Sequence, residues 1–288
     1  MGKKYILYNP ISGDGGGKSA AEMIALLNSD SEIVDILEIG NYSDFFSRID
    51  QKDDIILCGG DGTLNHFVND TKDIEIANDI YLYASGSGND FARDLGKSEK
   101  DDPNYRINDY LKNLPKVTIN GKERLFLNGI GYGIDGYCCQ VGDELREKNK
   151  NCDKPKPINY TTIAIKGLLS EYTPTNAYIT IDGKHREYKN VWLAPTMNGR
   201  YYGGGMMPAP MQKRLGGDGL LTLMVFHSRS KIRTLAAFPS LFKGEHIKHT
   251  DLVAIHRGKE ITVEFDRLTP LQIDGEVILN VSSYTAAK

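Results

Sequence analysis

The stretch Asp54–Thr63, DIILCGGDGT, joins a short apolar run to a turn that contains three glycines. A short apolar run bounded by a turn is typical of a buried strand, and glycine permits a tight backbone path out of it. Leu64, Phe67 and Val68 then follow at a helical spacing. The stretch therefore predicts a strand–turn–helix unit of an α/β layer fold.

The same pattern occurs on both sides of this stretch. The apolar run Lys4–Tyr8 precedes the glycine-rich Asn9–Gly17, and Ile80–Ala84 precedes Ser85–Asp90. In open α/β sheets, ligands bind at the carboxyl ends of the strands, and helix N-termini there favour phosphate. One such loop is explained equally well as a tight turn, but three together predict a polyphosphate site.

Length and composition exclude several classes of protein. The chain has 288 residues, 40% hydrophobic and 25% charged, which indicates an ordered globular protein of about two domains. With 35 Lys+Arg against 38 Asp+Glu, the net charge of −3 gives no basic excess, so we expect no nucleic-acid partner. The four cysteines form no C-x-x-C pair. No apolar run approaches the roughly 18 residues that span a bilayer, so we expect a cytoplasmic protein, peripheral at the inner membrane face.

The pattern changes near residue 116. Asn120-Gly121 and Asp182-Gly183 are hairpin signals, and further short apolar runs continue to the end of the chain at strand-like spacing. We therefore expect a β-rich second domain.

The first loop also contains a near match to a nucleotide-binding motif. Ser12–Ser19, SGDGGGKS, is close to a P-loop, but that motif requires glycine where Ser12 stands. The sequence also has no convincing apolar run ending in Asp, which a P-loop NTPase uses to bind its metal ion. A P-loop NTPase is therefore a weak alternative, and Lys18 is equally explained as a solvated helix residue.

Several motifs together resemble one family. They are Asn9-Pro10-x-Ser12-Gly13, Gly59-Gly60-Asp61-Gly62-Thr63-x-Asn65, Gly88-Asn89-Asp90-x-Ala92-Arg93, Asn198-Gly199, Gly203-Gly204-Gly205, Ala209-Pro210, Asp218-Gly219-x-Leu221 and Asp274-Gly275-Glu276. This set resembles the diacylglycerol kinase catalytic domain family, which includes soluble bacterial lipid kinases and is related to sphingosine kinases.

The resemblance implies a fold in two parts. An NAD kinase/phosphofructokinase-like three-layer α/β nucleotide-binding domain would span residues 1–124, and a β-rich sandwich domain with the lipid site and the catalytic base would span 125–277. The last residues, 278–288, would return in part to the first domain. The active site of relatives lies in the cleft between the two domains.

The resemblance also implies the cofactors, ATP and Mg²⁺. A catalytic Mg²⁺ would bind at Asp61, and a structural ion would bind Asp218 with the main-chain carbonyls of Leu215 and Leu220. The ATP site would comprise Asn9, Pro10, Ser12, Gly13, Gly59, Gly60, Asp61, Gly62, Thr63, Leu64, Asn65, Ser87, Gly88 and Asn89.

Four acidic residues are the expected catalytic set: Glu276, Asp61, Asp90 and Asp274. Glu276 matches the general base, which must accept the proton of a weakly acidic alcohol, although an exposed Asp-Gly turn is the alternative. Asp90 would join the acidic network around the metal, or else cap a helix. Asp274 would support Glu276, and Asp135 matches another family acid.

The expected activity is ATP-dependent phosphorylation of a hydroxyl of diacylglycerol or a related lipid. The alternatives are an NAD kinase-like activity on a soluble alcohol and an inactive nucleotide- or lipid-binding module. The inactive module remains an alternative because two residues, His66 and Gly217, depart from the family pattern. The expected partners are a lipid alcohol, a membrane surface in transient contact and, as an option, a second copy of the chain.

Overall fold

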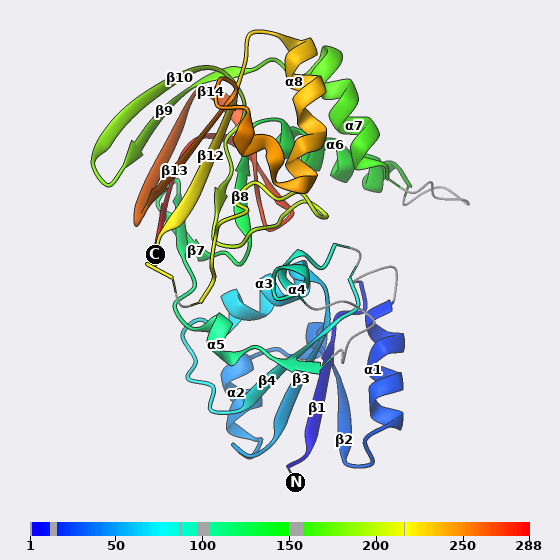
Figure 1. Ribbon diagram of the computed structural model, residues 1–288. Coiled ribbons are helices and arrows are strands. Elements are labelled where there is room, and N and C mark those ends of the chain that lie inside the picture. The colour runs from blue at the N-terminus through cyan, green and yellow to red at the C-terminus, as the bar shows by residue number, and fades with distance from the viewer. Residues whose placement is uncertain (1, 12–15, 87, 97–103, 150–157, 216) are drawn as a thin grey trace. The chain divides into compact units, whose positions relative to one another are not determined.

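The chain folds into two compact units (Figure 1). The computed structural model describes residues 2–11, 16–86, 88–96, 104–149, 158–215 and 217–288. Unit 1 is Met1–Leu114 and unit 2 is Pro115–Lys288. The expected α/β part followed by a β-rich part is therefore confirmed.

Unit 1 is built on a five-stranded sheet of order β2-β1-β3-β4-β5, in which β5 alone is antiparallel to its neighbour among the described residues. Its elements are β1 (Lys4–Tyr8), α1 (Gly16–Leu26), β2 (Ser31–Asp35), η2 (Ile36–Glu38), α2 (Tyr42–Ser47), β3 (Asp54–Gly59), α3 (Asp61–Asp70), β4 (Asp79–Ala84), α4 (Asp90–Asp94), β5 (Asn104–Arg106) and α5 (Asn108–Leu111).

Alternate residues of β1 point to opposite faces of this sheet, which gives three layers. Ile6 packs with Ile24 of α1 on one face, and Tyr5 meets the ring of Phe45 from α2 edge-on. The buried residues of α1 are Gly17, Ala20, Ala21 and Ile24. Met23 of the same helix and Leu27, just after its end, are exposed.

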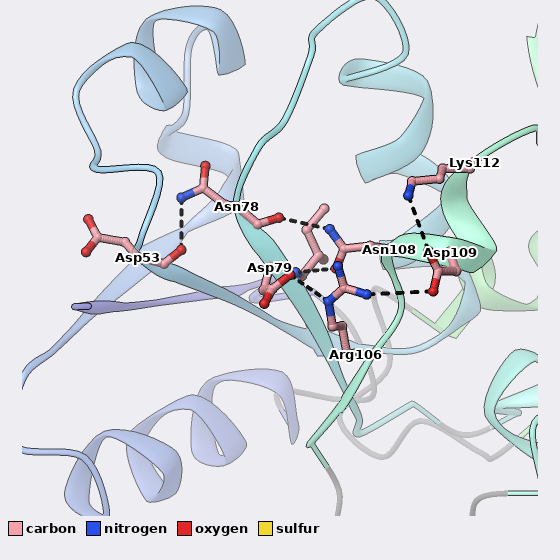
Figure 2. Close-up of polar contacts among 8 residues, drawn as sticks. Asp53, Asn78, Asp79, Arg106, Asn108, Asp109 and Lys112 are labelled. Atoms are coloured by element: carbon pink, nitrogen blue, oxygen red, sulfur yellow. Dashed lines mark hydrogen bonds and ion pairs between the residues drawn. The ribbon is translucent and has the colours of Figure 1, made fainter. Parts of the chain in front are cut away.

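The amino ends of β3 and β4 are joined by side-chain amides (Figure 2). The buried Asn78 donates from Nδ2 to the carbonyls of Asp50 and Asp53 at 2.8 and 2.9 Å. Asn108 donates to the carbonyl of Asn78 at 2.9 Å and accepts from the N–H of Ile80 at 2.8 Å. These contacts hold α5 against the sheet at the end opposite the glycine-rich turns.

Unit 2 is mostly antiparallel sheet with a small group of helices. Its elements are β6 (Lys116–Ile119), β7 (Lys122–Leu125), β8 (Gly129–Tyr132), α6 (Ile134–Asn149), α7 (Tyr160–Lys166), the π-helical η3 (Gly167–Glu171), β9 (Thr175–Ile181), β10 (Lys184–Leu193), β11 (Thr196–Met197), β12 (Leu221–His227), α8 (Lys231–Ala237), η4 (Phe238–Lys243), η5 (Glu245–Lys248), β13 (Val253–Gly258), β14 (Glu260–Ile273) and β15 (Glu276–Ala287).

The sheet of unit 2 has the strand order β7-β6-β15-β14-β8-β11-β12-β10-β9. Because β9 also pairs with β14, the strands from β14 to β9 in this order form a closed ring. Their inner side chains form one apolar core, in which Tyr132 stacks on Phe265 with ring centroids 3.8 Å apart. The hydroxyl of Tyr132 donates to the carbonyl of Val281 at 2.6 Å, which satisfies a buried polar group.

We expected the first domain to end at residue 124, but unit 1 ends at Leu114, ten residues earlier. The hairpin of β6 and β7 belongs to unit 2 because β6 pairs with β15. The segment 278–288, expected to return in part to the first domain, instead lies in β15 between β14 and β6. Within the described ranges, no helix combines the length and the apolar character needed to cross a membrane.

We predict that Asn78→Ala lowers the free energy of unfolding by about 2 kcal/mol, because it removes the amide that binds two carbonyls. Urea denaturation measures this loss. Lys112→Ala is the control, because Lys112 makes an exposed ion pair with Asp109 in the same network (Figure 2) and should change stability by less than about 0.5 kcal/mol. Equal effects of the two substitutions would contradict the assignment.

Candidate functional site

The glycine-rich turns after β1, β3 and β4 lie at one edge of the unit 1 sheet, as expected. Tyr8 pairs with Cys58, and Gly59 pairs with Ala84, so the three parallel strands end together. The turn after β1 is described only as far as Ile11, where the Asn9 side chain accepts the Ile11 N–H at 3.0 Å.

Two of these turns touch backbone to backbone. A Cβ on Gly86 would lie 2.5 Å from the Cα of Gly60, and a Cβ on Gly60 would lie 2.9 Å from the Cα of Gly86. Neither position therefore accepts a larger residue without movement of the backbone. Asn89 secures the third turn by donating to the carbonyl of Gly86 at 2.6 Å.

Asp61 joins the second turn to the start of α4. Its Oδ2 accepts the N–H of Asp90 at 2.8 Å and its Oδ1 accepts the N–H of Phe91 at 2.9 Å. The carboxylate thus satisfies two N–H groups at the start of a helix. The carboxylate is partly exposed, and carboxylate oxygens are ligands that suit Mg²⁺.

Of the other residues predicted to bind the nucleotide, some are buried and others are at least partly exposed. Thr63, Leu64 and Asn65 lie on the buried face of α3, so their side chains support the turn. Among those with at least partial exposure are Asn9, Pro10, Gly60, Gly62, Gly88 and Asn89, while Gly59 is buried against Thr63. Ser12, Gly13 and Ser87 lie outside the described residues.

Asp90 is 3% exposed at the first turn of α4, and its Oδ1 lies 3.7 Å from Nε of Arg93. The position agrees with a residue at a helix start, but the helix is capped by Asp61 rather than by Asp90. His66 is exposed on α3.

In unit 2, the Asp274 carboxylate binds three consecutive N–H groups. Oδ2 accepts from Leu127 at 2.6 Å, and Oδ1 accepts from Asn128 at 2.8 Å and from Gly129 at 3.0 Å. Asp274 and Gly275 both have positive φ, 48° and 95°, as a tight two-residue hairpin turn requires. Asp274 therefore anchors the turn between β14 and β15.

Glu276 follows this anchored turn at the start of β15. Its Oε2 accepts from Nη2 of Arg124 on β7 at 2.8 Å, and its side chain is 32% exposed. The ion pair sets the direction of the carboxylate, whose other oxygen, Oε1, is buried.

Comparison with known proteins identifies both units. Residues 3–118 match the diacylglycerol kinase catalytic domain, and residues 130–286 match the YegS C-terminal NAD kinase beta sandwich-like domain. The chain belongs to the diacylglycerol kinase catalytic domain family.

Full-length relatives agree with this family. A diacylglycerol kinase of Mycobacterium tuberculosis is 27% identical over 277 residues, which cover 92% of this chain and 85% of that protein. The crystal structure of a diacylglycerol kinase from Bacillus anthracis has a TM-score of 0.64 at 24% identity, covers 99% of this chain and 94% of its own, and supports the fold.

The structural ion expected in this lipid kinase family does not fit the residues present. Both Asp218 oxygens bind the Arg257 guanidinium, at 2.7 and 2.8 Å, and the Leu220 carbonyl accepts the buried Gln212 amide at 2.9 Å. The pKa of Asp218 is lowered: desolvation alone would raise this pKa, but the hydrogen bonds from Arg257 and the Leu220 N–H outweigh it. An arginine thus stands where Asp218, Leu215 and Leu220 were expected to hold Mg²⁺. No three His, Cys, Asp or Glu side chains of the described segments gather to bind a metal.

The sequence missed the residues that hold these carboxylates. Arg124 and Arg257 lie 152 and 39 positions from Glu276 and Asp218, and no local motif marks such pairs. These contacts join segments that lie apart in the sequence, so only the folded arrangement of the segments could have revealed them.

A buried carboxylate also distinguishes unit 2. Asp135 lies in the first turn of α6 and is 7% exposed, and a Cβ on Gly131 would lie 1.5 Å from its Oδ2. Burial raises the pKa of Asp135 to about 6, although the Gly136 N–H, the Tyr202 hydroxyl and the Gln272 amide oppose the shift.

We predict a pH-dependent effect of Asp135→Asn. Because the folded pKa is raised above the unfolded value, the stability that Asp135 contributes is present at acid pH and is lost as pH rises through about 6. Relative to the wild type, the variant should therefore gain on the order of 2 kcal/mol in free energy of unfolding between pH 4.5 and pH 8.

Urea denaturation at both pH values tests this expectation. Glu144→Gln, on the exposed face of the same helix, is the control and should show no such gain. A gain that is the same for both variants, or absent from both, would show that Asp135 is not a buried titrating group.

Proposed function

We propose that the protein is an ATP-dependent lipid kinase, which transfers the γ-phosphoryl group to a hydroxyl of diacylglycerol or a related lipid. The family match over both units supports a kinase of this class, and the name of the Mycobacterium relative supports the acceptor. The observation that carries the proposal is the position of the partly exposed Glu276, which Arg124 holds after a turn that Asp274 anchors.

The nucleotide is assigned to the glycine edge of unit 1. Gly60, the residue before α3, provides no side-chain cap, and the N-terminus of the helix carries a partial positive charge. The contact between Gly60 and Gly86 keeps two turns close enough for their amides to act on one phosphate chain. Positioning of this kind provides most of the catalysis in phosphoryl transfer.

Asp61 is the residue assigned to a catalytic Mg²⁺. Its carboxylate is partly exposed beside the glycine-rich turn, and carboxylate oxygens suit a cation that keeps several of its waters. When bound, the ion would neutralise charge on the phosphates.

Glu276 is assigned the role of general base toward the lipid hydroxyl. A carboxylate within hydrogen-bond reach can accept the alcohol proton as the oxygen attacks phosphorus. Asp274, which the sequence placed in the catalytic set, is a positioning residue in this proposal, because its two oxygens already bind three main-chain N–H groups.

We also propose transient contact with an anionic membrane surface through the helices of unit 2. Ile232 on α8 is 81% exposed and Leu169 of η3 is 54% exposed. Lys231 joins them, since its Nζ donates to the carbonyl of Leu169 at 3.1 Å. Apolar side chains beside cations suit the negatively charged surface of a bilayer.

We predict that Glu276→Gln lowers kcat for phosphate transfer to diacylglycerol in mixed micelles at least 100-fold, because the amide cannot accept the proton. Nucleotide binding, followed by titration calorimetry, should be unchanged. Glu264→Gln, an exposed glutamate of β14, is the matched control and should keep full activity. Unchanged turnover in Glu276→Gln would remove the base from the proposal.

A further inference from the structure

Unit 2 contains a pocket whose described lining residues are all distinct from those assigned to the kinase reaction. It has a volume of about 260 Å³ and is lined by α6, η3, the segment that follows η3, and β14. That volume lies below the roughly 300–1,000 Å³ typical of pockets for drug-sized ligands, so it suits a smaller group. The charged and aromatic residues of the lining are Tyr137, Glu171, Tyr172 and Arg267.

Two departures from regular secondary structure form walls of this pocket. The element η3 is a π-helix, in which the N–H of Tyr172 donates to the carbonyl of Gly167 at 2.9 Å. The pairing of β14 with β15 shifts register between Glu264 and Thr269, the stretch that contains Arg267. Both π-helical turns and strand bulges occur frequently at functional sites, where they redirect side chains.

The pocket presents one negative and one positive charge, each held by a neutral group. Oε2 of Glu171 accepts the hydroxyl of Tyr137, and Nη2 of Arg267 donates to the carbonyl of Thr173. The Arg267 guanidinium also lies over the ring of Tyr172, with Cζ 5.6 Å from the ring centroid. In the part of the chain that the structure describes, no ion pair joins Glu171 to Arg267.

The acid next to Arg267 is engaged elsewhere. Oδ1 of Asp266 accepts the hydroxyl of Thr175, and Oδ2 accepts Nδ2 of Asn176 at 2.8 Å. The bond from Thr175 is the main reason why the pKa of Asp266 is lowered, and the charge of Arg267 adds to the effect. The hydrogen bonds of Asp266 thus go to β9, while the guanidinium of Arg267 lines the pocket.

The pocket adjoins the helices that are assigned to membrane contact. Leu169, two positions before Glu171 in η3, is exposed, and its carbonyl accepts Nζ of Lys231 at 3.1 Å. Leu268, which follows Arg267 and lines the pocket, is 62% exposed. An exposed leucine therefore lies close in sequence to each charge of the pocket, an arrangement that suits a polar headgroup at a lipid surface.

We propose that this pocket binds a phosphoethanolamine group, with the primary ammonium at Glu171 and the phosphodiester at Arg267. An ionised carboxylate accepts strong hydrogen bonds from an ammonium, and the rings of Tyr137 and Tyr172 attract a cation. A guanidinium matches the geometry of phosphate oxygens. The group is carried either by a membrane lipid or by a soluble glycerol phosphodiester, and its binding requires no step of the proposed kinase reaction.

Glycerophosphoethanolamine tests the pocket without turnover. It is titrated by calorimetry into the full chain at constant ionic strength. Glu171→Gln and Arg267→Gln should each raise its Kd about tenfold or more, because each removes a charge-assisted hydrogen bond. The control variants Glu187→Gln and Arg186→Gln, on the exposed part of β10, should leave the Kd unchanged.

A second ligand separates the two charges. Glycerophosphoglycerol keeps the phosphodiester and lacks the ammonium, so the wild type should bind it about tenfold more weakly than glycerophosphoethanolamine. Arg267→Gln should weaken glycerophosphoglycerol further, whereas Glu171→Gln should not. Equal binding of the two ligands by the wild type, or an unchanged glycerophosphoethanolamine Kd in both Gln variants, would overturn the proposal.

Thermal melts separate binding from folding. The Gln variants should melt within about 2 °C of the wild type, since exposed charges contribute little to stability. If a Gln variant melts lower, Glu171→Asp and Arg267→Lys provide the comparison, because they keep the charges. Each should bind glycerophosphoethanolamine more tightly than its Gln counterpart, and binding that follows the melting temperature instead would contradict the assignment.

Vesicles identify the source of the group. Cosedimentation of the chain is compared between vesicles of phosphatidylethanolamine with phosphatidylglycerol and vesicles of phosphatidylcholine with phosphatidylglycerol, at equal anionic content. Tighter binding to the first, abolished by Glu171→Gln, assigns the pocket to the membrane lipid. Equal binding to both, with the glycerophosphoethanolamine Kd still dependent on Glu171, assigns it to the soluble ester. Because no phosphate transfer is needed, failure of the kinase reaction leaves these results interpretable.

Discussion

The Asp274 carboxylate, which accepts three consecutive main-chain N–H groups, is the interaction on which the functional end of unit 2 depends. Charge-assisted hydrogen bonds of this kind are roughly twice as strong as neutral ones. They tie the turn between β14 and β15 to the segment 127–129, and so set the place from which Glu276 projects. In the proposed reaction Asp274, two residues before Glu276, thus contributes by geometry rather than by chemistry.

Unit 1 uses an aspartate in a related way. Asp61 binds the first two N–H groups of α4, while Gly60 and Gly86 permit two turns to meet at their backbones. In both units a carboxylate organises main-chain groups next to the residues assigned to the reaction. The structure therefore prepares its amides and carboxylates before any ligand binds, which is what a reaction dominated by positioning requires.

Local patterns in the sequence were sufficient to predict the edge of unit 1, because parallel strands necessarily end together and glycines mark each turn. The family motifs predicted the fold of the two units. The unit boundary and the roles of Asp274 and Asp218 could not be predicted. They depend on the pairing of β6 with β15 and on Arg257, which are set by strand register across distant parts of the chain.

The most direct test of the account is transfer of label from γ-³²P-ATP by the wild-type chain with Mg²⁺, offered a panel of micellar lipid alcohols and soluble alcohols together. The account predicts label in an organic-phase lipid phosphate, with diacylglycerol or a close relative as acceptor. Label confined to a soluble acceptor, or nucleotide binding without transfer to any acceptor, would contradict it.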